Sequence, residues 1–97
     1  MTVVADISMI PIGEDVSVSK YVKVAINELR KTGLKVEIGA MSTTLEAENI
    51  TDIFKAVERA REAVFSVGVK RLYIILRVDE RRDKPISIES KKKAVES

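Results

Sequence analysis

Polar side chains gather in the segment GAMSTTLEAEN, residues 39–49. Ser42, Thr43 and Thr44 carry successive hydroxyls, and the carboxylate of Glu46 follows two residues later. A hydroxyl becomes a nucleophile when a neighbouring base, most often histidine, removes its proton. The chain contains no histidine and no cysteine, which excludes serine triads, thiol catalysis and the usual zinc sites. We therefore interpret these groups as hydrogen-bonding partners for a small ligand, and we predict no catalytic residue.

Acidic residues near the C-terminus raise the separate possibility of a metal site. Asp79, Glu80 and Asp83 could supply the oxygen ligands that calcium or magnesium prefers. Arginine and lysine residues alternate with these carboxylates along the same stretch. Such alternation is typical of a solvated turn whose charges compensate one another. We predict no metal site and no cofactor.

The composition is that of an ordinary folded protein. The chain has 97 residues, of which 45% are apolar and 33% are charged. A chain of this length fits one hydrophobic core, so we expect one domain over residues 1–97. Apolar runs such as residues 72–76 fall far short of the roughly 20 residues that a membrane span needs. We expect a cytoplasmic protein that does not bind membranes.

The small positive charge lies at one end of the sequence. The formal net charge is +2, and residues 77–97 contain seven basic and five acidic side chains. The whole excess therefore lies in this C-terminal stretch. A nucleic-acid-binding protein usually has a larger and less compensated basic surface, so we expect no nucleic-acid partner.

Hydrophobic periodicity divides the chain into elements that must position these groups. Alternating apolar residues indicate strands, and apolar residues at spacings of three and four indicate amphipathic helices. Glycine favours the left-handed conformation that ends a helix, and Asn49 or Thr51 is a suitable N-terminal cap. The predicted elements are a strand over 2–12, a helix between Val18 and Gly33, strands over 34–38 and 41–46, a helix over 49–67 ended by Gly68, a strand over 70–79 and a short helix from Ser87.

The order strand, helix, strand, strand, helix, strand is that of the ferredoxin-like fold, an α+β sandwich. Right-handed crossovers place both long helices on one face of an antiparallel sheet with strand order 4-1-3-2. The third strand then lies beside the first. Ser8 and Asp6 would therefore neighbour the polar groups of residues 43–46, which favours a ligand site. The alternative is that threonines merely suit a half-buried strand because they are β-branched.

The second face of the predicted sheet has no helix to cover it. Exposed apolar side chains beside a few polar groups are typical of a surface that meets another subunit. We therefore expect self-association as a homodimer, which could pair again into a homotetramer. The alternation places on this open face Val4, Asp6, Ser8, Ile10, Tyr73, Ile75 and Arg77.

Several segments, in order, resemble one known family. The segments ADISMIPIG, SVSKYV, GLKVEIGAMSTTLEAE and GVKRLYIILRVDERRD are similar to small thiamine-binding proteins related to the YkoF-type domain, long described as an uncharacterised family. The similarity covers nearly the whole chain. The most specific pieces are Ser8-x-x-Pro11-Ile12-Gly13, Ser19-x-Tyr21-Val22, Met41-x-Thr43-x-x-Glu46 and Val78-Asp79-x-Arg81.

This resemblance implies a ferredoxin-like domain that assembles into dimers and tetramers. It implies binding of thiamine or its hydroxymethylpyrimidine moiety without catalysis, as a carrier or sensor would bind it. Carried over by position, Ser8, Met41, Thr43 and Glu46 would line or border the pocket. The chain departs from the family pattern at Ser42, where relatives favour glycine, so an added hydroxyl stands beside the expected pocket.

Two other functions suit the same topology. An acylphosphatase would need an arginine in the loop after the first strand, but that loop holds Gly13, Glu14 and Asp15 and no arginine. An asparagine would also be expected on the hairpin, whereas Asn49 lies beyond it. The second alternative is a structural or regulatory interaction module that has no ligand pocket of its own.

Overall fold

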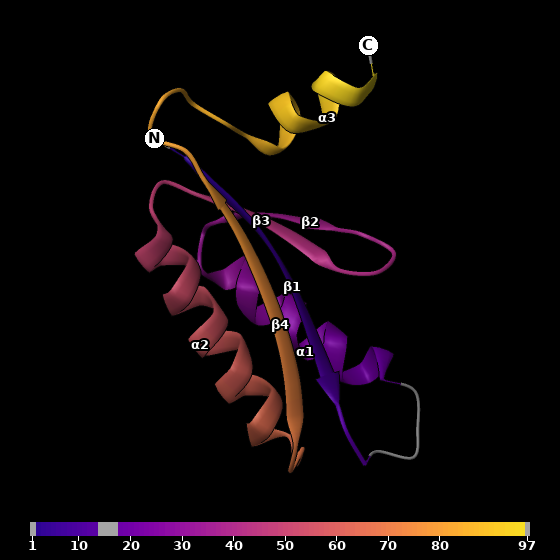
Figure 1. Cartoon of the computed structure of the whole chain (residues 1–97). Coiled ribbons are helices and arrows are strands. Elements are labelled where there is room, and N and C mark those ends of the chain that lie inside the picture. The colour runs from indigo at the N-terminus through magenta and orange to yellow at the C-terminus, as the bar shows by residue number, and fades with distance from the viewer. Residues whose placement is uncertain (1, 14–17, 97) are drawn as a thin grey trace.

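Two helices pack on one face of a four-stranded antiparallel sheet in a computed structural model of the chain (Figure 1). The structure describes residues 2–13 and 18–96, so Glu14 and Asp15 of the loop discussed above lie outside the described residues. The strand order β2-β3-β1-β4 is the predicted 4-1-3-2 order, which confirms the ferredoxin-like fold. The elements are β1 (Val3–Pro11), α1 (Ser19–Lys31), β2 (Lys35–Ile38), β3 (Thr43–Ala47), α2 (Ile50–Ser66), β4 (Leu72–Glu80) and α3 (Ile88–Glu96).

The core lies between the sheet and the two long helices. Alternate side chains of a strand point to opposite faces, and one set from β1 is buried beneath α1 and α2. β3 contributes Leu45, which is fully buried between these layers. The helices contribute apolar stripes at helical spacing. The helical side of the core includes Tyr21, Ala25, Leu29, Ile53, Ala56, Ala60 and Val64.

The helix ends follow local sequence signals. The Asn49 side chain accepts a hydrogen bond of 3.0 Å from the main-chain N–H of Asp52, so it caps α2 as predicted. Gly33 and Gly68 have φ angles of +84° and +106°. Residues with a Cβ rarely adopt such angles, which explains why glycine follows both long helices.

The hairpin between β2 and β3 differs from its predicted form. β3 begins at Thr43, whereas the sequence suggested Met41. Residues 39–42 form the connection, which is closed by a 2.9 Å hydrogen bond from Gly39 N–H to the Ser42 carbonyl oxygen. A Cβ at Gly39 would lie only 2.7 Å from that oxygen, so the turn needs glycine there. Met41 therefore belongs to the loop and is not part of the strand.

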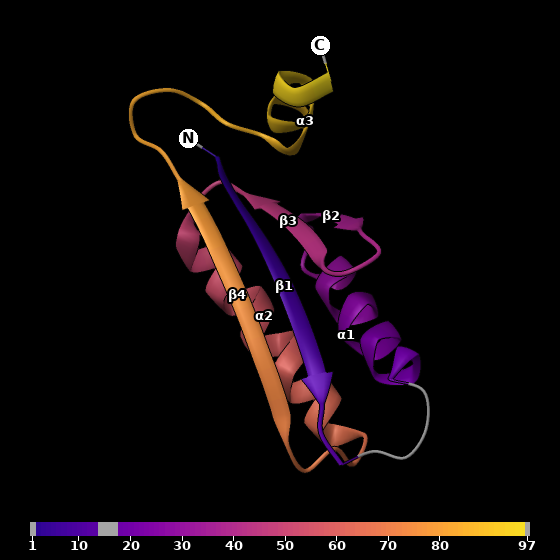
Figure 2. The same ribbon diagram turned by 45° about the vertical axis from the view of Figure 1, so that its right-hand side comes forward.

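One end of the open sheet face is covered, contrary to the sequence expectation. Val4 is buried against Ile86, which precedes α3, and against Ile88, the first residue of α3. The Thr2 hydroxyl donates to the Ile86 carbonyl oxygen, and Ser87 caps α3 by accepting from Ser90 N–H at 3.0 Å. Figure 2 shows α3 at the end of the sheet where β1 begins, near the N-terminus. The C-terminal residues thus form a small second apolar cluster.

The other end of this face leaves Ile10, Tyr73 and Ile75 exposed. Tyr73 lies opposite Ile10 in the β1–β4 pairing, and Ile75 is two residues further along β4.

Among residues 2–13 and 18–96, no helix is long and apolar enough to cross a membrane.

Candidate functional site

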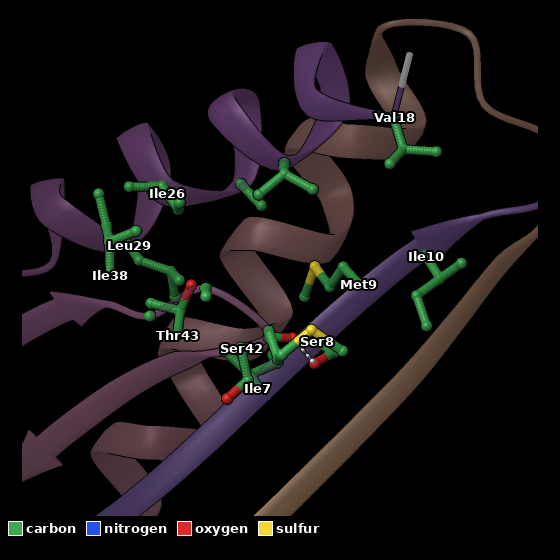
Figure 3. A pocket seen from close by; sticks show the side chains of 15 residues that line it. Ile7, Ser8, Met9, Ile10, Val18, Ile26, Leu29, Ile38, Ser42 and Thr43 are labelled. Atoms are coloured by element: carbon green, nitrogen blue, oxygen red, sulfur yellow. Dashed lines mark hydrogen bonds between the residues drawn. The ribbon is translucent and has the colours of Figure 1, made fainter. Parts of the chain in front are cut away.

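A cavity of about 270 Å³ opens between α1, the end of β1 and the hairpin loop (Figure 3). Its lining is dominated by apolar side chains from the sheet and from α1. This volume lies just below the range of about 300 to 1,000 Å³ for ligand pockets, which suits a small ligand. The lining residues are Ile7, Ser8, Met9, Ile10, Val18, Val22, Ala25, Ile26, Leu29, Ile38, Gly39, Ala40, Met41, Ser42 and Thr43.

The cavity exists because β1 continues where β3 does not. β1 pairs with β4 as far as Pro11, but its pairing with β3 ends where Ile7 lies opposite Thr43. Residues 8–11 of β1 therefore have no paired strand on the β3 side. α1 covers this gap on the helical side of the sheet. Residues 39–42 close the end of the gap where β3 begins.

Because β3 is shorter than β1, some main-chain groups of β1 have no strand partner at the edge beside the cavity. Ile12 N–H donates to the Arg71 carbonyl oxygen at 2.9 Å, across the β1–β4 pair. Alternate residues of an antiparallel strand direct their N–H and C=O groups to opposite edges. Residues 8 and 10 therefore face β4, whereas the N–H and C=O of Met9 face the side where β3 has ended. Met9 thus offers one donor and one acceptor beside the pocket.

Thr43 supplies a polar side chain to the pocket wall. It is only 6% exposed, and its hydroxyl makes no hydrogen bond with the residues that the structure describes. Within those residues, every side-chain nitrogen or oxygen that solvent cannot reach makes a hydrogen bond. The Thr43 hydroxyl must therefore be reached from the cavity, in keeping with its position in Figure 3. A ligand in the pocket could satisfy it.

Ser8 and Met41 meet at the pocket rim. The Ser8 hydroxyl donates to the Met41 carbonyl oxygen at 3.3 Å, which ties the loop to β1. The Met41 side chain is 90% exposed, because it belongs to the loop. A flexible thioether in that position could pack on the face of a bound ring.

Ser42 borders the pocket without filling it. Its hydroxyl donates to Asp6 Oδ2 at 3.1 Å, on the opposite face of the sheet. The Arg77 guanidinium binds the same carboxylate through both Nε and Nη2. This hydrogen bonding by Arg77 holds the pKa of Asp6 below its ordinary value, and the Ser42 hydroxyl also lowers it, although partial burial raises it. The added hydroxyl therefore points away from the ligand space.

Two of the predicted site residues lie away from this pocket. Thr44 points to the open face, where it lines a separate shallow hollow with Asp6 and Arg77. Glu46 is also on that face, and its Oε1 accepts a 2.8 Å hydrogen bond from Ile88 N–H at the start of α3. The structure thus brings together Ser8, Met41, Ser42 and Thr43, but it separates them from Thr44 and Glu46. Ligand contact by any of the six remains a prediction.

Sequence reasoning missed the wall that α1 contributes. Val22 and Ile26 lie on the predicted helix between Val18 and Gly33 and line the cavity, although neither was predicted as a site residue. Met9, within the predicted first strand, was likewise not predicted to line a pocket. The available signal was the length of the strands, because the predicted first strand is longer than the third by several residues.

The pocket is suited to binding a neutral or weakly polar group. Every side chain that the structure describes in its wall is apolar or carries a hydroxyl. Among residues 2–13 and 18–96, no group of three or more acidic, histidine or cysteine side chains could hold a metal ion. The polar contacts on offer include the hydroxyls of Thr43 and Ser8 and the main chain of Met9.

Comparisons with known proteins agree on one family. A family model described as thiamine-binding protein matches residues 5–96. The UPF0045 protein MJ1052 of Methanocaldococcus jannaschii is 47% identical over 93 residues, covering 96% of this chain and 91% of the relative. Its crystal structure has a TM-score of 0.89, with 97% of this chain and 95% of that chain covered.

More distant relatives extend the same agreement. The UPF0045 protein YqgV of Bacillus subtilis is 36% identical over 97 residues, covering 95% of this chain and 92% of the relative. A Thermotoga maritima protein provisionally attributed to thiamine biosynthesis or salvage is 26% identical in its solved structure. That structure has a TM-score of 0.84 and covers 97% of this chain and 98% of its own. With nearly the whole sequence matched and the fold shared, this chain belongs to the thiamine-binding protein family.

Proposed function

We propose that this protein is a non-catalytic binding protein for thiamine or its hydroxymethylpyrimidine moiety. The observation that carries the proposal is the apolar pocket beneath α1, with the buried Thr43 hydroxyl, which has no hydrogen-bond partner among the described residues, in its wall. Family membership supports a thiamine-related ligand. The protein would act as a carrier or sensor, because the described wall offers hydrogen bonds and apolar surface but no group that commonly acts as a base.

The pyrimidine ring is the part of thiamine that this pocket suits. Thiamine joins a neutral aminopyrimidine to a cationic thiazolium ring. Burying a cation without a counter-charge is costly, and the described pocket wall contains no carboxylate. The thiazolium would therefore remain at the mouth, in contact with water, while the pyrimidine ring enters between α1 and the sheet.

The main chain of Met9 complements an aminopyrimidine edge. An aminopyrimidine presents an amino donor beside a ring-nitrogen acceptor. An unpaired residue at a strand edge presents an N–H donor and a C=O acceptor in the same plane. We propose that Met9 forms this pair of hydrogen bonds and that Thr43 bonds a further ring atom. Apolar contacts from Val22 and Ile26 would hold the ring faces.

Isothermal titration with three ligands tests the proposal directly. Hydroxymethylpyrimidine and thiamine should both release or absorb measurable heat, with similar dissociation constants, whereas the isolated thiazolium alcohol should bind far more weakly. No heat with hydroxymethylpyrimidine or thiamine at millimolar concentration would overturn the proposal and favour the interaction-module alternative.

A pair of variants on α1 tests whether hydroxymethylpyrimidine binds in the pocket. Val22 lines the cavity, whereas Val24 packs against the main core on the same helix. Val22→Phe should fill the cavity and reduce hydroxymethylpyrimidine affinity at least tenfold. Val24→Phe, the matched control, should leave affinity unchanged within about twofold if the variant is folded by circular dichroism. Equal effects of the two substitutions would place the ligand elsewhere.

We also propose self-association through the uncovered end of the open sheet face. Ile10, Tyr73 and Ile75 form an exposed apolar strip there, and burying it against a second copy would be favourable. Native mass spectrometry should show dimers or tetramers, and Ile75→Lys should yield smaller species. Val67→Lys, at an exposed apolar position after α2, is the control. A monomeric wild-type protein would refute this proposal.

A further inference from the structure

The Ser42 hydroxyl links the pocket loop to a charged pair on the other face of the sheet. Its hydrogen bond to Asp6 Oδ2 is 3.1 Å long. Arg77 Nε donates to Asp6 Oδ1 at 2.9 Å, and Arg77 Nη2 donates to Oδ2. The Asp6 side chain is 19% exposed and that of Arg77 is 77% exposed. The carboxylate is thus a partly buried anchor between two donors.

Asp6 is well placed to act as an anchor because its backbone is fixed. It lies in a central strand that pairs with β3 on one side and β4 on the other, opposite Thr44 and Arg77 respectively. Its bidentate contact with Arg77 restricts rotation of the carboxylate. The remaining hydrogen-bonding capacity of Oδ2 then points to Ser42. A hydrogen bond to a charged acceptor is stronger than one between neutral groups.

Two other hydrogen bonds among the described residues hold the loop that Ser42 ends. Ser42 itself accepts the 2.9 Å hydrogen bond from Gly39 N–H that closes the turn. A further hydrogen bond, from the Ser8 hydroxyl to the Met41 carbonyl oxygen, ties the loop to β1 at 3.3 Å. Because residues 39–42 form one wall of the pocket, the position of that wall depends on these few bonds.

We propose that Asp6, held by Arg77, is a positioning residue that fixes the pocket wall through the Ser42 hydroxyl. Neither Asp6 nor Arg77 lines the cavity, so both act through the loop. The tether keeps Ser42 turned toward the open face and keeps the loop away from the ligand space. Its effect on ligand affinity rests on the proposed function, but its effect on the loop does not.

Amide hydrogen exchange of the ligand-free protein tests the tether. Ser42→Ala removes only the hydroxyl, and the Gly39 amide should then exchange about tenfold faster because the loop opens more often. Ser42→Thr restores a hydroxyl and should return most of the protection. Ser66→Ala, which removes a hydroxyl bonded to Ala63 at the end of α2, is the control and should leave Gly39 unchanged. Unchanged Gly39 exchange in Ser42→Ala would overturn the proposal.

A second variant separates the anchor from the serine. Asp6→Asn keeps an oxygen that can accept from Ser42 but loses the charge that binds Arg77. It should accelerate Gly39 exchange by several-fold, less than Ser42→Ala does. Hydroxymethylpyrimidine titration of the same variants should show affinity falling in the same order. If the wild-type protein binds no ligand, the proposed function fails while the exchange data still decide the tether.

Discussion

The pocket beneath α1 and the α3 corner, which we define as the contacts of α3 with Val4 and Glu46, lie on opposite faces of one sheet. Both use residues of the segment 39–49. On the pocket side, Thr43 is buried, and its hydroxyl has no hydrogen-bond partner within residues 2–13 and 18–96. On the α3 side, Glu46 is engaged by the Ile88 amide. Adjacent polar residues thus have different roles because strand side chains alternate. The fold therefore divides residues that are close in sequence between two roles. Thr43 is available to a ligand, whereas Glu46 makes a structural contact with α3.

The first prediction contrasts the stability of the two regions. Leu29 is 1% exposed and belongs to both the main core and the pocket wall. Leu29→Ala should lower the free energy of unfolding by about 2 to 5 kcal/mol, the usual cost of a large cavity. Chemical denaturation monitored by circular dichroism measures this change. A loss below about 1 kcal/mol would show that the pocket wall is not part of the cooperative core.

The companion substitution in the α3 corner should act locally. Ile88 packs with Val4 and Ile86 in the small second cluster, so we expect α3 to detach while the sheet remains folded. Ile88→Ala should therefore cost only about 1 to 2 kcal/mol globally but should abolish slow hydrogen exchange in α3. Val95→Ala, at a position 84% exposed, is the control. A global loss as large as that of Leu29→Ala would remove the distinction between the regions.

The second prediction concerns Glu46, which the family resemblance places at the ligand and the structure places at α3. Glu46→Gln removes the charge that accepts from Ile88 N–H at the helix N-terminus and should weaken α3 docking by about 1 kcal/mol. Exchange of the first-turn amides of α3 reports this change. Hydroxymethylpyrimidine affinity should stay the same. Weaker binding with unchanged α3 exchange would instead assign Glu46 to the ligand.

The third prediction is the pH dependence of the Asp6 tether. Arg77 lowers the pKa of Asp6 below its ordinary value of 3.8, so the ionised form is favoured in the folded state. The contribution of Asp6 is therefore complete above that ordinary value and is lost as the pH falls through the lower, folded-state pKa. Gly39 protection, corrected for intrinsic exchange, should fall over this acidic range.

Two carboxylate variants isolate the origin of this pH effect. Asp6→Asn should remove the step in Gly39 protection. Asp83→Asn removes another carboxylate bound by an arginine, Arg81, in an exposed turn, and it should leave the step in place. A step that persists in Asp6→Asn would assign the titration to another group.

The fold followed from sequence because its signals are local and repeated. Strand alternation, helical apolar stripes and the caps at Asn49 and Gly68 all favour the same element order, and the topology rules then fix the sheet. The loop position of Met41 was missed because the turn that begins at Gly39 ends three residues later, at Ser42, inside a run that still alternates. Such boundaries depend on main-chain hydrogen bonds that composition does not reveal.

The site was only partly predictable for a related reason. The convergence of Ser8 with the residues after Gly39 follows from strand order, and the structure shows it. The division between Thr43 and Thr44 depends on which face of β3 each residue occupies, and the contact of Glu46 depends on where the C-terminal segment returns. The latter is a long-range packing outcome, because 41 residues lie between Glu46 and Ile88 in the sequence.

The most direct test of the account compares two neighbouring threonines. Thr43→Val and Thr44→Val each replace a hydroxyl with a methyl group on a β-branched side chain, but they act on opposite faces of β3. By isothermal titration, Thr43→Val should weaken hydroxymethylpyrimidine binding about three- to tenfold, the value of roughly one neutral hydrogen bond. Thr44→Val should leave affinity unchanged within about twofold. Equal losses, or a larger loss in Thr44→Val, would contradict a ligand site beneath α1.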